Sequence, residues 1–229
     1  MINNLKLGVR VLRYGYGIGM SLIQGALFLL MGGLFFVMDV TSFGSAFQRG
    51  FFGNFMFMCI GMLPAQVLYS LSAVSMVQAS PMKKKLQTAV PTAITWVSMT
   101  FLYLVTALMR GIVVLMQPER LSEVCIELVA LGVIIAFLML YTGVAYKYFL
   151  AITIFFALSF WLIFFYRSWM ISWWNLFGTN ENTFSFVLAV VTGLTCIAAG
   201  GIGEYLLSLL VYRAPMSKMA QMAPLRKEL

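Results

Sequence analysis

Long apolar runs separated by short polar segments are the dominant pattern of this chain. An α-helix needs about 20 apolar residues to cross a hydrocarbon core about 30 Å thick. Windows of this kind occur at residues 20–38, 55–77, 90–112, 124–143, 148–166 and 185–211. The pattern predicts an all-α membrane protein with six transmembrane helices, in a domain spanning residues 20–212, followed by a tail over 213–229.

The composition supports a membrane protein and argues against several other classes. Of 229 residues, 62% are hydrophobic and 10% charged, against about 45–50% and about 25% in an ordinary soluble domain. This excludes a cytosolic enzyme, a nucleic-acid-binding protein and a disordered chain. The chain contains no His, so the usual Ser/His and Cys/His nucleophile pairs are absent. We expect no catalytic residue and no metal site in this chain, and we interpret Cys59, Cys125 and Cys196 as small buried hydrophobes.

Basic residues are divided unevenly between the two sets of loops. The amino-terminal segment, the connection after the second span, the turn at Lys147 and the tail together carry 11 of the 15 Lys and Arg residues. The alternate loops carry most of the acids. Because Lys and Arg are retained on the cytoplasmic side of a membrane, we expect both termini to be cytoplasmic and the chain to be a multi-pass protein of the plasma membrane.

The amino-terminal segment, residues 1–19, has apolar and basic residues that recur at helical spacing on different faces. The basic residues are Lys6, Arg10 and Arg13. This pattern is typical of an interfacial helix, with its apolar side in lipid and its cationic side toward anionic head groups. The alternative is a simple basic anchor that fixes the topology.

A second basic segment lies between the second and third spans, at about residues 80–88. Ser80 is placed to cap a short helix, and Pro81 suits its first position, where a missing N–H costs nothing. Three consecutive lysines follow, with an apolar residue, Leu86, behind them. We predict an ordered, basic helix presented to a cytoplasmic partner; the alternative is a topology anchor.

The fifth and sixth spans are separated by residues 167–184, which contain Trp169, Trp173 and Trp174. Tryptophan favours the head-group region of a membrane, so this segment either dips into the outer leaflet as a re-entrant element or forms an aromatic belt.

Two ionisable residues fall inside predicted spans. Glu204 follows three glycines in the last span, and an acid at that depth is costly unless it faces the bundle interior, water or a cation. It therefore serves gating or subunit packing, or it lies near enough to the inner surface to extend to it or to pair with a basic residue. Arg110 lies near the outer end of the third span, and we expect its side chain to extend to that surface.

The order of these elements resembles the membrane subunit of ABC-2 type ATP-binding-cassette exporters. The likeness is carried by INNLKLGVRVLRYGYG at 2–17, similar to that family's elbow helix, and by ASPMKKKLQTAVP at 79–91, similar to its first coupling region. GVAYKY at 143–148 lies where a second, smaller coupling element is expected. Residues 167–184 correspond to the family's short re-entrant helices.

The resemblance implies an ABC-2, type V exporter-like architecture and a set of ATPase-coupling residues. These are Ser80, Pro81, Met82, Lys83, Lys84, Lys85, Leu86 and Lys147. The chain has no GxxxxGK[ST] motif, so ATP and Mg would be bound by a separate ATP-binding-cassette ATPase subunit. The resemblance also implies a second membrane subunit, identical or paralogous, and outward movement of a peptide, lipid or drug across a membrane, here expected to be the bacterial inner membrane.

A rival interpretation is a secondary carrier, or a non-transport membrane protein that acts in assembly or immunity by interaction. Carriers tend to place ionisable residues and broken helices near mid-membrane, in repeated halves. Only Glu204 approaches that pattern, and the first three spans do not resemble the last three. A membrane-embedded enzyme is a third possibility, which the absence of His weakens.

Overall fold

The computed structural model describes Lys6, Ala79 and residues 18–41, 47–72, 81–165 and 186–214. Every regular element in these ranges is helical. The elements are α2 (Ile18–Thr41), α3 (Phe47–Ser72), α5 (Lys83–Gln87), α6 (Ala89–Met116), the 3₁₀-helix η1 (Pro118–Arg120), α7 (Leu121–Phe165) and α9 (Phe186–Tyr212). Arg10, Arg13, Ser80, the outer segment 167–184 and most of the tail lie outside the described residues.

Four helical stretches are long and apolar enough to cross a membrane. They are Ser21–Met38, Lys83–Met116, Pro118–Ala145 and Phe186–Tyr212, and a shorter apolar stretch covers Gly53–Ala65 within α3. The prediction of an all-helical, membrane-embedded chain is therefore confirmed at this level. Helix α2 has large apolar side chains that are exposed on much of its surface, including Leu22, Leu27, Leu30 and Leu34, as expected for a helix that faces lipid.

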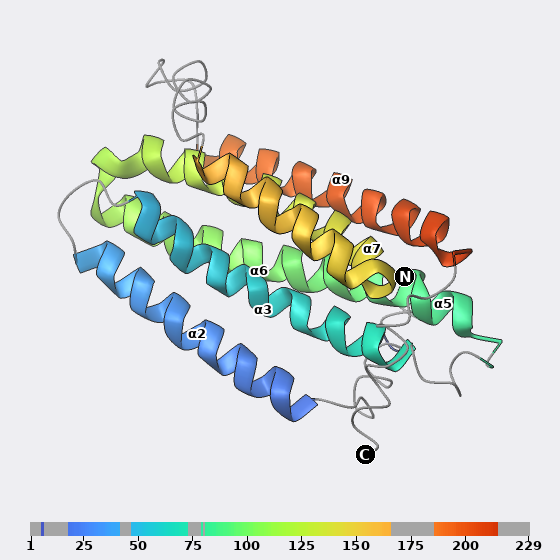
Figure 1. The fold of residues 1–229 in the computed structure, drawn as a ribbon. Helices are drawn as coiled ribbons and strands as arrows, with labels where there is room; N and C mark the ends of the chain where they lie inside the picture. The colour runs from blue at the N-terminus through green and yellow to red at the C-terminus, as the bar shows by residue number, and fades with distance from the viewer. Residues whose placement is uncertain are drawn as a thin grey trace.

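Helix α7 is interrupted at one residue. Tyr148 has φ −123° and ψ 44°, which are not helical values, so α7 consists of two helical halves. Figure 1 shows that the second half turns back toward the end of the bundle at which α7 begins. The predicted windows 124–143 and 148–166 fall on the two sides of this reversal.

Because of this reversal, each connection between helices lies at one of the two ends of the bundle. One end, which we call the α5 end, contains α5, the Tyr148 turn and the last turn of α9 (Figure 1). The other, which we call the η1 end, contains η1, the last turn of α6 and the first turn of α7 (Figure 1). The α5 end therefore gathers the connections that the distribution of basic residues assigned to the cytoplasm.

Helices α7 and α9 pack together through glycine. A Cβ on Gly132 of α7 would lie 2.5 Å from the Cα of Gly193 in α9, and a Cβ on Gly200 of α9 would lie 2.6 Å from the Cα of Ala136. At these positions one backbone meets the other directly, which is the close approach that small residues permit between membrane helices. The first half of α7 and α9 run parallel, because facing residue numbers rise together.

A tyrosine joins α6 to this pair. Tyr103 of α6 is fully buried, and its hydroxyl donates a hydrogen bond of 3.3 Å to the Leu128 carbonyl of α7. Its hydroxyl also occupies the space that a Cβ on Gly193 would enter. The centre of the bundle therefore depends on a polar side chain that crosses from α6 over a glycine of α9 to reach α7.

Candidate functional site

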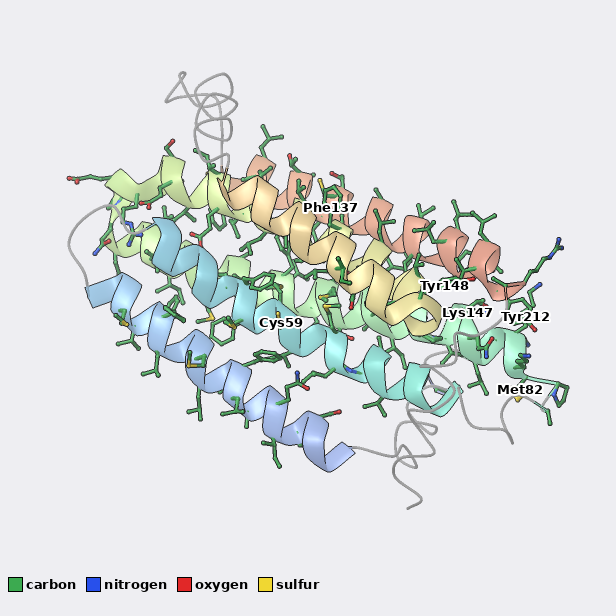
Figure 2. The ribbon with its side chains drawn as sticks, in the orientation of Figure 1. Cys59, Met82, Phe137, Lys147, Tyr148 and Tyr212 are labelled. Carbon is green, nitrogen blue, oxygen red and sulfur yellow. The ribbon has the colours of Figure 1, made fainter. Side chains whose placement is uncertain are left out.

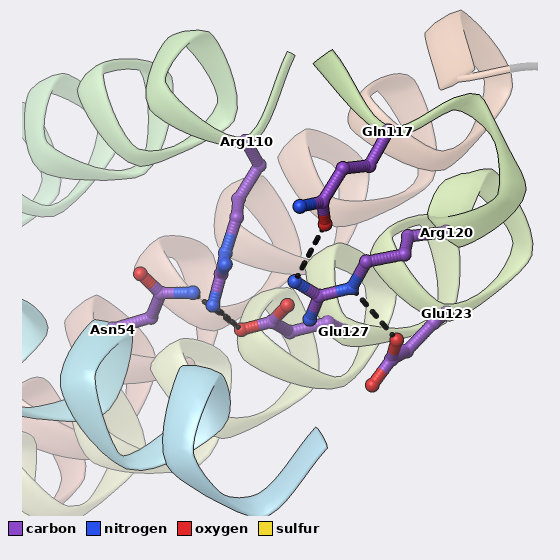
Figure 3. Close-up of polar contacts among 6 residues, drawn as sticks. All are labelled: Asn54, Arg110, Gln117, Arg120, Glu123 and Glu127. Carbon is purple, nitrogen blue, oxygen red and sulfur yellow. Dashed lines mark hydrogen bonds and ion pairs between the residues drawn. The ribbon is translucent and has the colours of Figure 1, made fainter. Parts of the chain in front are cut away.

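A buried ion pair lies inside the bundle, toward the η1 end. Arg110 Nη2 of α6 is 2.7 Å from Glu127 Oε1 of α7, and the two side chains are 0% and 2% exposed. Asn54 of α3, also buried, donates a hydrogen bond to the same carboxylate oxygen (Figure 3). The Arg110 guanidinium lies 5.7 Å from the ring centroid of Phe36 in α2. Side chains from α2, α3, α6 and α7 thus meet at one guanidinium–carboxylate pair.

The prediction that Arg110 extends to the outer surface is wrong. Arg110 is six residues from the end of α6, about 9 Å along the helix at 1.5 Å per residue. An arginine side chain reaches the surface at the end of α6 only if it extends along the helix toward that end. Here it points inward, because Glu127 and Asn54 compensate the cost of burying its charge. A usable signal in the sequence was spacing, since Arg110 continues the buried stripe of α6 that contains Tyr103 and Val113.

A second polar cluster covers the η1 end but lies at the surface. Arg120 Nε is 3.1 Å from Glu123 Oε2, and Arg120 Nη1 donates to Gln117 Oε1 over 3.4 Å (Figure 3). Both members of the Arg120–Glu123 ion pair are partly exposed. Solvent therefore screens their attraction, and the pair contributes little to stability. These residues hold the η1 turn and form no chemical site.

The basic segment at the α5 end is a short helix, as predicted, but it begins later than expected. The sequence indicated Ser80 as the cap and Pro81 as the first helical residue; instead Pro81 and Met82 form a turn and the helix covers Lys83–Gln87. The first helical bond there runs from the Leu86 amide to the Met82 carbonyl, 3.0 Å. Proline, which lacks an N–H, is accommodated in the turn without losing a bond.

Helix α5 is fixed to the bundle on one side and exposed on the other. Leu86 packs against the buried side chains of Leu68, Val90 and Ile94. Lys84 and Lys85 are exposed, and Lys83 is half-buried. At the far end of α5 the Thr88 amide and hydroxyl both donate to the Lys84 carbonyl. The result is an anchored, ordered element that presents positive charge at the α5 end.

Lys147 faces inward and is not part of this exposed surface. The resemblance grouped it with the coupling residues, but its side chain is only 2% exposed. Its ammonium donates hydrogen bonds of 2.6 Å to the carbonyls of Val211 and Tyr212, and a further one to Ala214. Val211 and Tyr212 are the last two residues of α9, where carbonyls have no amide partner within the helix; the Val211 carbonyl also accepts from the Ala214 amide, over 2.9 Å. Lys147 therefore joins the Tyr148 turn to the end of α9 (Figure 2).

The surroundings of Lys147 also place it near α5. Burial lowers the pKa of the Lys147 ammonium below its usual 10.5, and the positive charge of Lys83 lowers it further. The Tyr212 ring centroid lies 5.6 Å from Lys147 Nζ. Lys83 is thus half-buried in α5, whereas Lys147 is enclosed.

Replacing Lys147 with methionine tests its capping role. The variant keeps most of the length of the side chain but removes the donor to the carbonyls of Val211, Tyr212 and Ala214, of which the Val211 carbonyl still accepts from the Ala214 amide. We expect the free energy of unfolding to fall by about 1–3 kcal/mol and protease cleavage near Arg213 to accelerate. The measurements are reversible unfolding in mixed micelles and limited trypsin digestion. Lys85→Met, which removes an exposed lysine, is the matched control; an equal loss in both variants would contradict the capping role.

Glu204 is enclosed within the bundle. Its side chain is 0% exposed, and a Cβ on Gly143 of α7 would lie 3.4 Å from Glu204 Cγ. The carboxylate lies eight residues before the end of α9, about 12 Å along the helix. It therefore does not reach the surface at the α5 end, which was one of the two interpretations of this residue. The other, a role inside the bundle, stays a prediction.

No metal centre is found in the part of the chain that the structure describes: no group of three or more His, Cys, Asp or Glu residues there could hold an ion. Comparisons of the chain with protein-family models, with curated proteins and with solved structures find no match.

Proposed function

We propose that the chain is the membrane subunit of an ATP-driven exporter and that it works with a separate ATPase subunit. The observation that carries the proposal is α5: a five-residue basic helix, anchored by Leu86, with Lys84 and Lys85 exposed at one end of the bundle. A simple topology anchor needs only basic residues in a loop. An ordered helix held by apolar packing is better suited to transmit force from a partner.

The contacts of α5 suggest how a movement would spread. Helix α5 packs against α3 and α6, the helices that it connects, and it also touches α9. In the proposed mechanism, ATP closes the ATPase dimer, α5 moves with the ATPase surface, and α3 and α6 change their tilt. The substrate, an amphipathic or hydrophobic molecule such as a peptide, lipid or drug, must bind the two resulting states with different affinity, because a ligand that binds both equally shifts nothing.

The proposal includes a six-pass layout of the ABC-2 type and a second membrane subunit. The passes are α2, α3, α6, the two halves of α7 and α9. The reversal at Tyr148 supports this layout, because it brings both the start and the end of α7 to the η1 end (Figure 1). The amphipathic segment with Lys6, Arg10 and Arg13 would precede the first pass along the inner membrane surface.

The double variant Lys84→Glu/Lys85→Glu tests the coupling surface. The tagged chain is purified from its own host, and co-purifying ATPase subunits and ATP hydrolysis are measured. We expect an ATPase subunit to co-purify with the wild-type chain in stoichiometric amount. The variant should lose this subunit, and its rate of ATP hydrolysis should fall by at least about tenfold, because reversed charges repel a surface that lysines attract. Both substituted side chains are exposed, so the fold is preserved.

Glu119→Lys serves as the matched control, since it reverses an exposed charge at the η1 end. It should leave the ATPase bound and active. A wild-type chain that carries no ATPase and moves its substrate on an ion gradient alone would contradict the proposal and favour a secondary carrier. Unchanged ATP hydrolysis in the lysine variant would remove α5 from the mechanism.

A further inference from the structure

Charge at the α5 end is of one sign among the described residues. Four exposed or half-buried basic side chains lie there: Lys83, Lys84, Lys85 and Arg213. The described acids are elsewhere, because Asp39, Glu119, Glu123 and Glu127 belong to the η1 half and Glu204 is enclosed. Positive charges that lie close together repel one another, and a bound anion reduces this repulsion. The described part of the α5 end is therefore suited to bind a negatively charged group.

Lys83 begins α5 and Arg213 follows α9, two elements that contact each other. Helix α5 lies beside the end of α9 (Figure 1). Lys83 is close enough to Lys147 to repel its charge, and Lys147 is bonded to the carbonyls of Val211 and Tyr212. Arg213 is the next residue and is exposed. Two cationic side chains from different elements thus border the same corner of the bundle.

An apolar column on α9 leads directly to this corner. Ile202, Leu206 and Leu210 are 59%, 54% and 73% exposed and follow one another at intervals of four residues, so they lie on one face of the helix. Arg213 lies three residues after Leu210, directly beyond the last residue of α9. The column covers about 12 Å along the helix axis between its first and last members. It is an apolar strip that ends in a cation, which matches an acyl chain joined to a phosphate.

We propose that the junction of α5 and α9 binds an anionic phospholipid, whose phosphate lies between Lys83 and Arg213 and whose acyl chain lies along Ile202, Leu206 and Leu210. A basic residue at a membrane surface attracts anionic lipid. The two basic positions and the apolar column place one molecule at a defined position. The lipid would stabilise the corner at which α5, the Tyr148 turn and the end of α9 meet, whether or not the chain is an exporter.

Lipid retention by the intact chain tests this proposal. The protein is delipidated in detergent, mixed with phosphatidylglycerol or with phosphatidylcholine of the same acyl chains, and examined by native mass spectrometry across a lipid titration. We expect one phosphatidylglycerol to be retained in preference to phosphatidylcholine. In Lys83→Gln/Arg213→Gln the apparent affinity should fall about 30-fold, which is about fivefold for each basic residue removed. Arg120→Gln, at the η1 end, should retain the lipid as the wild type does.

One further variant and one further ligand distinguish binding of a whole phospholipid from binding of a free phosphate group. Leu206→Gln should weaken phosphatidylglycerol retention while every basic residue is kept. Equal retention of both lipids, unchanged retention in Lys83→Gln/Arg213→Gln, or binding of glycerol phosphate as tight as that of the whole lipid would overturn the proposal. Because Lys84 and Lys85 are untouched, loss of lipid with the ATPase still bound, or the reverse, distinguishes a failure of this inference from a failure of the proposed function.

Discussion

Glu127→Ala is expected to lower the free energy of unfolding by about 3–5 kcal/mol, the largest effect of any single substitution considered. The change leaves Arg110, which is 0% exposed, without the carboxylate that lies 2.7 Å away. Removing one partner of a buried ion pair takes away the main compensation for the other partner's charge, in surroundings that solvate it poorly. Asn54 also loses its acceptor. Reversible unfolding in mixed micelles, followed by circular dichroism, measures the loss.

Two companion variants make this prediction specific. Arg110→Met/Glu127→Leu removes both charges and fills their volume, and we expect most of the stability to return, because a buried pair replaced by apolar side chains is often neutral. Arg120→Ala breaks the exposed pair with Glu123 and should cost at most about 1 kcal/mol. If Glu127→Ala is no more harmful than Arg120→Ala, the buried pair does not hold the η1 half together.

The second large effect is expected at the contact between α7 and α9. In Gly132→Ala the new methyl group would lie 2.5 Å from the Gly193 Cα and 2.9 Å from its carbonyl oxygen. Backbone atoms cannot move aside as a flexible side chain can, so the two helices must separate. Overpacking of this kind costs about 1–3 kcal/mol, and the loss of neighbouring contacts places this site at the upper end. Gly200→Ala, which meets the Ala136 backbone, should behave in the same way.

Gly33→Ala is the matched control for these substitutions. A Cβ at Gly33 in α2 would meet nothing within 4 Å. Alanine favours a helix over glycine by about 0.5–1 kcal/mol, so this variant should be slightly more stable than the wild type. Thermal unfolding and monodispersity in detergent compare the three variants. Equal stability of Gly132→Ala and Gly33→Ala would mean that α7 and α9 are less tightly packed than described.

The membrane helices and the short basic helix could be predicted, because each depends on a continuous stretch of sequence. The long apolar runs identified the membrane helices, and the lysines between α3 and α6 identified α5. The beginning of α5 was predicted incorrectly, since Pro81 fits a turn as well as a first helical residue. The turn at Tyr148 coincides with the first residue of the predicted span 148–166, close to the predicted boundary between two spans.

The sequence by itself determined that this chain is apolar, helical and embedded in a membrane, because those properties follow from composition and from the length of apolar runs. Only the tertiary structure decided that Arg110 pairs with Glu127, that Lys147 caps α9 and that Glu204 is enclosed against Gly143. Helical periodicity tells which face of a helix is buried. It does not tell which helix lies opposite, and the role of a buried charge depends on the group that it meets there.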